Sequence, residues 1–182
     1  MAGQLTTRVA KTGDNPFLRL VAAISTLAGC MSAGMIVAAV AITCQMIYVR
    51  FVLNGSTIWQ TEAVVYLMIA ATLIGLPYVQ RLRGHVNVDL IPLVFGPRGR
   101  FILACVTLSL SIFIVGVMLF YGFDYWLYAY ERGWRSDTVW GVRLWIPYLA
   151  MPVGFGLFLL QLIADFVAMI LKIETPFGLE EG

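Results

Sequence analysis

The polar and ionisable residues that could do chemistry are few, and they gather in three short segments of an apolar chain. In the first, Trp59 and Glu62 stand three residues apart where an apolar run begins. A carboxylate in the first turn of a helix is stabilised by the positive end of the helix dipole, and a carboxylate at membrane depth is usually paired. Glu62 is therefore interpreted either as a solvated first-turn charge or as the partner of an arginine, from this chain or another. Thr57 and Gln60 have the spacing of a capping box and predict reciprocal caps at this helix start.

The second segment begins at Arg81, which is predicted to end a helix against lipid headgroups. Gly84 permits a sharp change of direction after it. Asp89 can cap a short apolar piece, Leu90–Phe95, which is too short to span a membrane and is expected to lie along an interface. His85 is the only histidine. It either orients the loop through a hydrogen bond or relays protons.

The third segment opens the last apolar run. Pro147 near the first helical turn costs nothing, whereas Pro152 removes a hydrogen bond inside the helix and predicts a bend. Gly154 offers a thin face for close packing. Further along, Asp165 is expected to form a structural ion pair with Lys172 or with the arginines that end the second run. Ion transport through this carboxylate is the alternative.

The elements that position these residues are membrane spans. The chain has 182 residues, of which 60% are hydrophobic and 12% charged, against about 25% charged in soluble domains. Crossing the hydrocarbon takes about 20 apolar residues in a helix, and four stretches qualify. We predict an all-α integral membrane protein with four transmembrane helices and short interfacial helical segments. The spans are expected at about 18–49, 60–80, 100–124 and 145–171, in a membrane domain 14–172 between a disordered cytoplasmic tail, 1–13, and a second cytoplasmic tail, 173–182.

The distribution of lysine and arginine predicts the orientation of these spans. One side carries eight such residues: Arg8, Lys11, Arg19, Arg81, Arg83, Arg98, Arg100 and Lys172. The other carries four: Arg50, Arg132, Arg135 and Arg143. Both termini are therefore expected in the cytoplasm. The outer loop, 125–143, is rich in tyrosine and tryptophan, which predicts that part of it lies in the outer headgroup region.

Several classes of function lack their motifs in this sequence. There is no Walker A motif, nucleophile elbow, carboxylate pair or cluster of metal ligands, so we predict neither an enzyme nor a bound cofactor or metal, and no nucleic-acid partner. A single histidine argues against a haem anchor. The two halves share no repeat, and the centres of the spans carry few polar groups, which disfavours a self-sufficient carrier.

The order of these motifs resembles one known family. Trp59-x-x-Glu62 opens the second span, Gly84-His85-Val86-x-Val88-Asp89 follows it, and Ile-Pro-Tyr and Pro-Val-Gly elements lie in the last span. This pattern resembles the small membrane subunit, of DctQ type, of tripartite ATP-independent periplasmic (TRAP) transporters. The resemblance covers nearly the whole chain.

The resemblance implies a scaffold role and defined partners. A periplasmic solute-binding protein would capture a small organic acid, and a large membrane subunit of about twelve spans would carry it with a sodium gradient across the bacterial inner membrane. The present chain would pack against that subunit and against lipids, through contacts at Trp59, Glu62, Arg81, Gly84, His85, Asp89, Pro147, Pro152 and Asp165. Two alternatives stay open. One is a stand-alone oligomeric exporter with Glu62 as its proton-coupled carboxylate, and the other is the membrane anchor of a redox complex.

Overall fold

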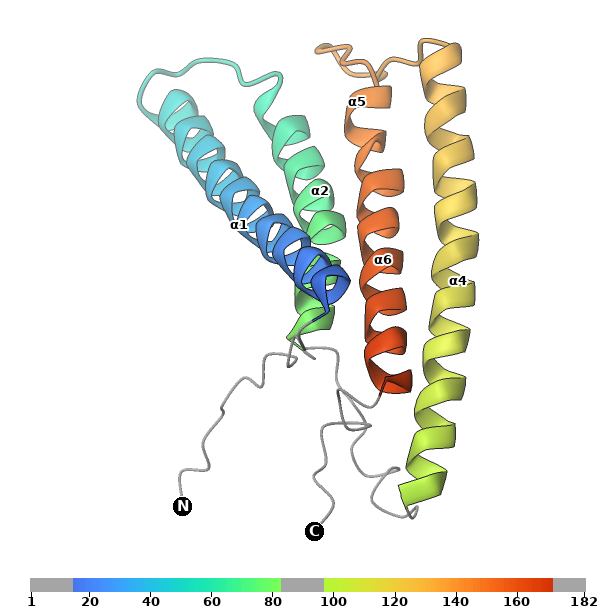
Figure 1. Ribbon diagram of the computed structural model, residues 1–182. Helices are drawn as coiled ribbons and strands as arrows, with labels where there is room; N and C mark the ends of the chain where they lie inside the picture. The colour runs from blue at the N-terminus through green and yellow to red at the C-terminus, as the bar shows by residue number, and fades with distance from the viewer. Residues whose placement is uncertain (1–14, 83–96, 172–182) are drawn as a thin grey trace, which may run out of the picture.

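The computed structural model describes residues 15–82 and 97–171, and within these stretches the chain forms helices joined by loops (Figure 1). The helices are α1 (Pro16–Phe51), α2 (Gln60–Arg81), α4 (Pro97–Glu131), α5 (Trp145–Tyr148) and α6 (Ala150–Ile170). Four stretches are long and apolar enough to cross a membrane: Pro16–Phe51, Gln60–Arg81, Phe101–Glu131 and Trp145–Ile170. The all-α membrane fold predicted from the sequence is confirmed. The short interfacial piece expected at Leu90–Phe95 lies outside the described residues.

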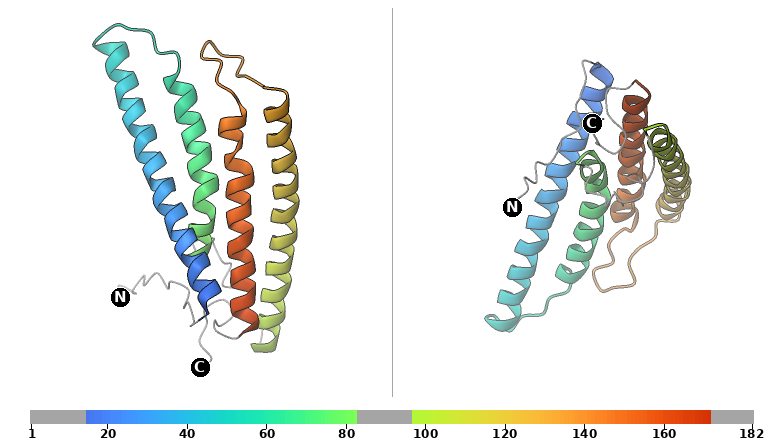
Figure 2. Two further views of the ribbon diagram at one scale, coloured as in Figure 1. Left: turned by 45° about the horizontal axis from the view of Figure 1, so that its top comes forward. Right: turned by 90° about the horizontal axis from the view of Figure 1, so that it is seen from below.

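The four long helices stand side by side in a row, in the order α1, α2, α6, α4, instead of closing into a bundle (Figure 2). The two helices at the ends of the row, α1 and α4, bury few residues. Only 11% of the most apolar stretch of each is buried, against 33% for the span that contains α6. A row of apolar helices leaves two broad apolar faces exposed. Such surface is stable only in contact with lipid or with another apolar protein surface.

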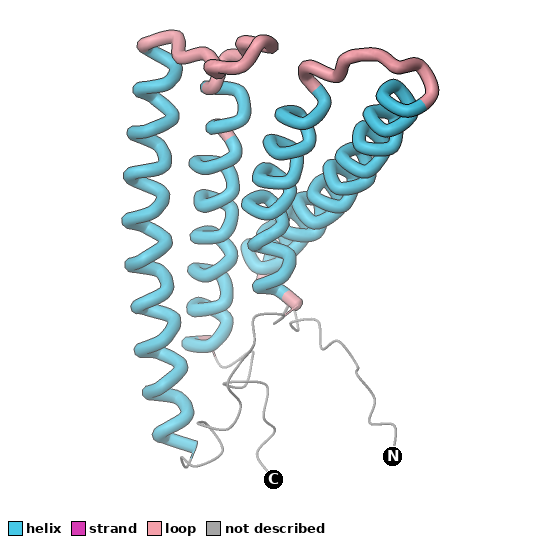
Figure 3. The backbone as a smooth tube through the Cα atoms, turned by 180° about the vertical axis from the view of Figure 1, so that it is seen from behind, coloured by secondary structure: helices cyan, strands magenta, loops and turns pink. Residues whose placement is uncertain are grey.

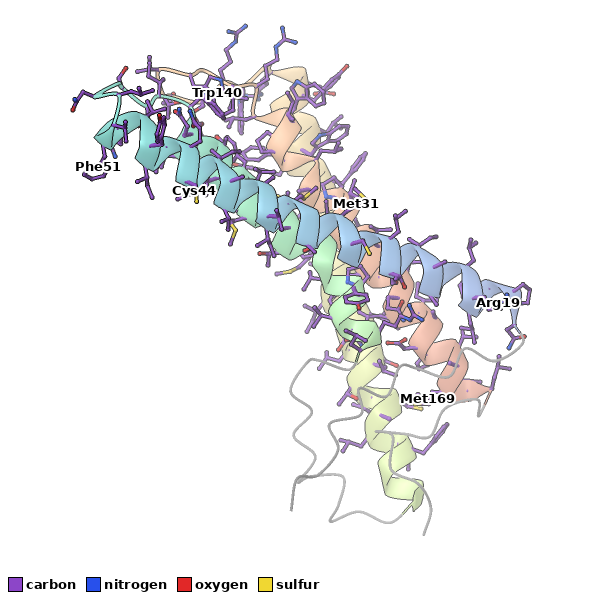
Figure 4. All side chains as sticks on the ribbon, turned by 90° about the vertical axis from the view of Figure 1, so that its left-hand side faces the viewer. Arg19, Met31, Cys44, Phe51, Trp140 and Met169 are labelled. Atoms are coloured by element: carbon purple, nitrogen blue, oxygen red, sulfur yellow. The ribbon has the colours of Figure 1, made fainter. Side chains whose placement is uncertain are left out.

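Helix α1 is 36 residues long, which corresponds to about 54 Å and exceeds the hydrocarbon thickness of about 30 Å. It begins at Pro16, whose missing N–H costs nothing at the first helical position, with Asn15 as the N-cap residue. The helix runs obliquely from Arg19 to Phe51 across its neighbours (Figure 4). This tilt accommodates the excess length, as expected for a span longer than the bilayer core.

Near its N-terminal end, α1 contacts both α2 and α6. Leu18 and Val21 form a buried apolar cluster there with Ala164 and Ala168 of α6. Toward Phe51, α1 leans away from α6, so its outer half packs only on α2 in the row (Figure 1). The core of the molecule therefore lies at the end where α1 begins and α6 ends.

Glycines set the close approach of α2 to its two neighbours. A Cβ atom added at Gly154 of α6 would lie 2.8 Å from the backbone oxygen of Leu73, and one added at Gly75 would lie 2.8 Å from Ser32 Oγ of α1. Ser32 also donates a hydrogen bond of 2.6 Å to the carbonyl of Ala71. The thin face expected at Gly154 is thus a point where two helix backbones meet.

Two elements differ in detail from the sequence prediction. Helix α4 continues to Glu131, past the boundary expected near residue 124, so residues 125–131 of the expected outer loop are a helical extension and the loop itself comprises residues 132–144. The last span is interrupted at Leu149, between α5 and α6. Pro152 explains the interruption, because it has no N–H to donate to the carbonyl of Tyr148, four residues earlier. Pro147 lies inside the single turn of α5.

Candidate functional site

The carboxylate of Glu62 is the centre of a polar cluster at the end of the molecule that carries both described loops (Figure 3). Tyr66, one turn further along α2, donates a hydrogen bond of 2.5 Å to Oε1. Ser136 donates to the same oxygen, and Thr138 donates to Oε2 at 2.5 Å. Three hydroxyl groups thus bind one carboxylate, and two of them come from the loop that joins α4 to α5.

Glu62 lies in the first turn of α2, as expected, and is partly exposed. Its partners among residues 15–82 and 97–171 are hydroxyl groups and not an arginine, so the carboxylate is not ion-paired within that part of the chain. The roles of Ser136 and Thr138 were not predicted from the sequence, because these residues lie 74 and 76 positions from Glu62 in the chain and no local pattern links them to it.

The loop between α4 and α5 is a short hairpin, residues 132–144, whose ends are set by glycine. Gly133 has φ +59°, Trp134 N–H donates to the carbonyl of Ala129, and Gly133 N–H donates to that of Tyr130. This is the Schellman arrangement that ends a helix. At the tip of the hairpin, Gly141 has φ +59°. Its N–H donates to the carbonyl of Thr138, and this hydrogen bond closes the turn.

The hairpin is fastened to the helices by aromatic rings as well as by Glu62. Trp140 at its turn lies against Trp59, with ring centroids 6.2 Å apart, at the same end of the molecule as Phe51 (Figure 4). Trp126 donates from Nε1 to the carbonyl of Trp145 at 3.1 Å. Further ring contacts join the extension of α4 to the hairpin and to α5, in the pairs Tyr125–Trp134, Tyr125–Tyr148 and Tyr130–Trp145, and Trp126 stacks on Tyr130 within α4. These ring contacts hold the hairpin and α5 against the end of α4.

The start of α2 corrects one detail of the sequence analysis. The capping box expected from Thr57 and Gln60 does not form, since Trp59 is the N-cap residue and no side chain caps it. Gln60 is instead buried against α1, where its Nε2 lies 3.4 Å from Gln45 Oε1. Burial between two apolar helices has overridden the local capping pattern.

A second polar network joins three helices near the opposite end of the row. Ser25 of α1 donates to Gln161 Oε1 at 2.6 Å, and Gln161 donates to Asp165 Oδ1 at 2.7 Å. Gln80 of α2 donates to Asp165 Oδ2 at 2.9 Å. Asp165 thus links α2 to α6, and Gln161 links α6 to α1. Ser25 and Gln161 are almost completely buried.

Arg81 ends α2 beside this network. Its Nη1 donates to the carbonyl of Ala22 at 2.9 Å and also to Thr26 Oγ1. The guanidinium therefore ties the last turn of α2 to α1. An arginine at a helix C-terminus is also favoured by the dipole of its own helix.

The remaining predicted site residues divide simply. Trp59 and Glu62 both contact the hairpin at one end of the row, Arg81 and Asp165 lie near the opposite end, and Pro147 and Pro152 lie at the start of the last span. Gly84, His85 and Asp89 lie outside the described residues. Within the stretches that the structure describes, no three His, Cys, Asp or Glu side chains are grouped so that they could hold a metal ion.

Comparison with known protein families decides the identity of the chain. Residues 39–172 match the family described as "Tripartite ATP-independent periplasmic transporters, DctQ component". The chain belongs to the DctQ family. The match begins within α1 and includes the Glu62 cluster, Arg81 and Asp165. No curated protein of known function matches the chain.

Membership of the DctQ family makes the chain the small membrane component of a TRAP transporter. Members of this family work with a large DctM subunit and a periplasmic binding protein. The four spans agree with a multi-pass membrane protein.

Proposed function

We propose that this DctQ chain is the static scaffold of a sodium-coupled, binding-protein-dependent secondary transporter for a small organic acid. In this role it packs against the large transport subunit, of about twelve spans, and holds it in place in the inner membrane. The chain itself neither binds the solute nor catalyses a reaction.

The observation that carries this proposal is the use of the buried polar groups. The buried polar side chains among the described residues are Ser25, Gln60 and Gln161. Each of them forms a hydrogen bond to a side chain on a helix other than its own. A carrier needs polar groups within the membrane that remain available to contact its solute. Here Ser25 and Gln161 bond to each other between α1 and α6, and Gln60 contacts Gln45 of α1 through Nε2, while its Oε1 has no partner among the described residues. Polar groups engaged between helices suit a part that keeps its shape while another part moves.

The exposed apolar faces of the row support a large membrane partner. Side chains on both outer helices are strongly exposed, among them Val37 and Phe51 of α1 and Phe113 and Phe120 of α4. Lipid covers part of this surface, and the large subunit covers the rest. From the charge distribution we propose that both termini are cytoplasmic and that the Glu62 cluster and the hairpin therefore lie on the outer side, where a binding protein arrives.

The bonding of Glu62 counts against the exporter hypothesis. A proton-coupled carboxylate must alternate between exposure to the two sides of the membrane, whereas Glu62 is held at one end by Tyr66, Ser136 and Thr138. A structural role for this carboxylate fits the scaffold better.

Reconstitution in liposomes tests the proposal. We expect sodium-dependent uptake only when this chain, the large subunit and the binding protein are all present, and none from this chain alone. Glu62→Ala and Arg81→Ala are expected to reduce uptake by the complete system, because each removes a contact that positions α2. Saturable uptake by this chain alone would refute the scaffold role.

A further inference from the structure

Two arginines face each other at the base of the outer hairpin. Arg135 and Arg143 form an isolated antiparallel β-bridge, flanked by backbone hydrogen bonds of 2.9 Å from Ser136 to Val142 and from Leu144 to Trp134. Like charges placed directly opposite each other on paired strands destabilise the pairing. The fold thus brings together two charges that repel each other.

Within residues 15–82 and 97–171, neither guanidinium of this pair forms an ion pair, and both side chains are exposed. Glu62, the carboxylate bound to the same hairpin, is occupied by hydroxyl groups. Asp137, two residues after Arg135 and so on the same face of the strand, offsets part of the positive charge but forms no ion pair with either arginine.

The hairpin also fixes the direction of the pair. Ser136 and Thr138 turn their hydroxyl groups toward Glu62 on α2. Because side chains alternate between the two faces of an extended strand, Arg135 lies on the opposite face, away from the helices, and Arg143 lies beside it. The contact of Trp140 with Trp59 and the bonds to Glu62 hold the hairpin in this position. A surface held in this way loses little freedom on binding.

We propose that the Arg135–Arg143 pair is a docking site for an acidic patch on the soluble solute-binding protein. This inference rests on the proposed function for the partner and for the outward position of the hairpin. Each guanidinium can bind a carboxylate through two parallel hydrogen bonds. Val139, at the turn between the two arginines, is 88% exposed and adds an apolar contact beside this charged site.

The position of the pair favours a soluble partner over lipid phosphate. Trp126, Tyr130 and Trp145 pack together where α4 meets α5, and such rings belong at the level of the lipid headgroups. The hairpin follows the last turn of α4 and turns its arginines away from the helices. The hairpin's own rings, Trp134 and Trp140, are turned toward the helices, where they contact Tyr125 and Trp59. The arginine pair is on the opposite face of the hairpin, which leaves it open to the aqueous side.

The test is a charge reversal in the complete transporter. Arg135→Glu/Arg143→Glu and the neutral Arg135→Gln/Arg143→Gln are reconstituted with the large subunit in phosphatidylcholine liposomes, and uptake is measured while the binding protein is titrated. We expect the reversal to raise the binding-protein concentration for half-maximal uptake by about tenfold or more, with a smaller shift for the neutral variant, because repulsion slows association and weakens the complex. The wild-type affinity should fall with added salt more steeply than that of either variant.

Three controls make the result decisive. Arg50→Glu reverses an exposed charge near the same end, outside the hairpin, and should titrate like the wild type. Each variant must co-purify with the large subunit as the wild type does, which separates docking from assembly. If the wild-type chain neither assembles nor supports uptake, the proposed function itself fails.

Two results would overturn the docking site while leaving the scaffold role intact. One is an assembled reversal variant that titrates with the binding protein like the wild type. The other is a defect that depends on added phosphatidylglycerol and is the same at every binding-protein concentration, which would make the pair a lipid contact.

Discussion

At the scale of single residues, the few polar side chains form hydrogen bonds between segments that are distant in sequence. Glu62 holds the hairpin 132–144 to α2, and Gln161 joins α1 to α6. In an apolar environment a polar side chain without a partner costs about 1–3 kcal/mol, so each such group selects a specific partner. The apolar residues alone would leave many packings of similar energy.

Removing the Glu62 carboxylate should free the hairpin. Glu62→Ala abolishes the acceptor of three hydroxyl groups, and a loss of about 1–2 kcal/mol raises the open population about five- to thirtyfold. Trypsin, which cleaves after Arg132, Arg135 and Arg143, reports that opening as faster cleavage within the hairpin. Asp124→Ala, which removes an exposed carboxylate of α4, should leave the cleavage rate unchanged. Equal rates in wild type and Glu62→Ala would mean that the aromatic contacts alone hold the hairpin.

Gln161 should be the most sensitive position of the inner network. Gln161→Leu keeps the volume of the side chain and removes bonds to Ser25 and Asp165, so we expect a loss of about 1–3 kcal/mol in stability. Thr107→Val is the matched control, because the Thr107 hydroxyl is exposed and bonds only to its own helix. Unfolding of the purified chain in detergent, followed by circular dichroism, measures both. A Gln161→Leu chain as stable as the control would show that the network is dispensable.

At the scale of elements, glycine positions decide how closely α2 and α6 approach. Gly154→Ala places a methyl group against the backbone of Leu73, which cannot move aside as a flexible side chain could. We expect about 1–3 kcal/mol of destabilisation from overpacking. Gly116→Ala, on the open side of α4, has no atom within 4 Å of the new methyl group and should be neutral or slightly stabilising. A thermal denaturation midpoint for Gly154→Ala equal to that of Gly116→Ala would contradict the close contact.

The sequence predicts elements of this kind well, because hydrocarbon thickness sets the minimum length of an apolar run that can cross a membrane. The four spans follow from such runs. The end of α4 was harder to predict, since aromatic residues suit an interfacial loop and a projecting helix equally. The residue that marks this end in the sequence is Gly133, because a glycine with positive φ commonly ends a helix.

The polar contacts were beyond sequence reasoning for a different reason. A helix that is apolar on all sides carries no stripe that marks its inner face, so the partners of Ser25 and Gln161 depend on the order of the helices in the row. The same holds for Ser136 and Thr138, which meet Glu62 only because α4 and α6 bring the hairpin back over α2. Glu62 itself could be singled out by its place in the first helical turn.

At the scale of the whole molecule, the single row of helices is the property that most needs explanation. A closed bundle would bury one face of each helix, whereas here α1 and α4 bury only 11% of their most apolar stretches. The contacts within the chain are therefore few for its size. A scaffold that covers a much larger protein gains from this shape, because a flat row offers a broad surface to one side.

This shape predicts that the partner supplies part of the chain's stability. A ligand that binds only the folded state raises its apparent stability by mass action, and a large apolar interface does so strongly. We expect the midpoint of thermal unfolding of this chain, read as loss of trypsin resistance on heating, to be higher in the complex with the large subunit than in the purified chain at equal detergent concentration. The chain mixed with an unrelated membrane protein of similar size is the control and should melt like the chain alone. Identical midpoints in complex and isolation would indicate that the row is stable by itself and that its exposed faces meet lipid only.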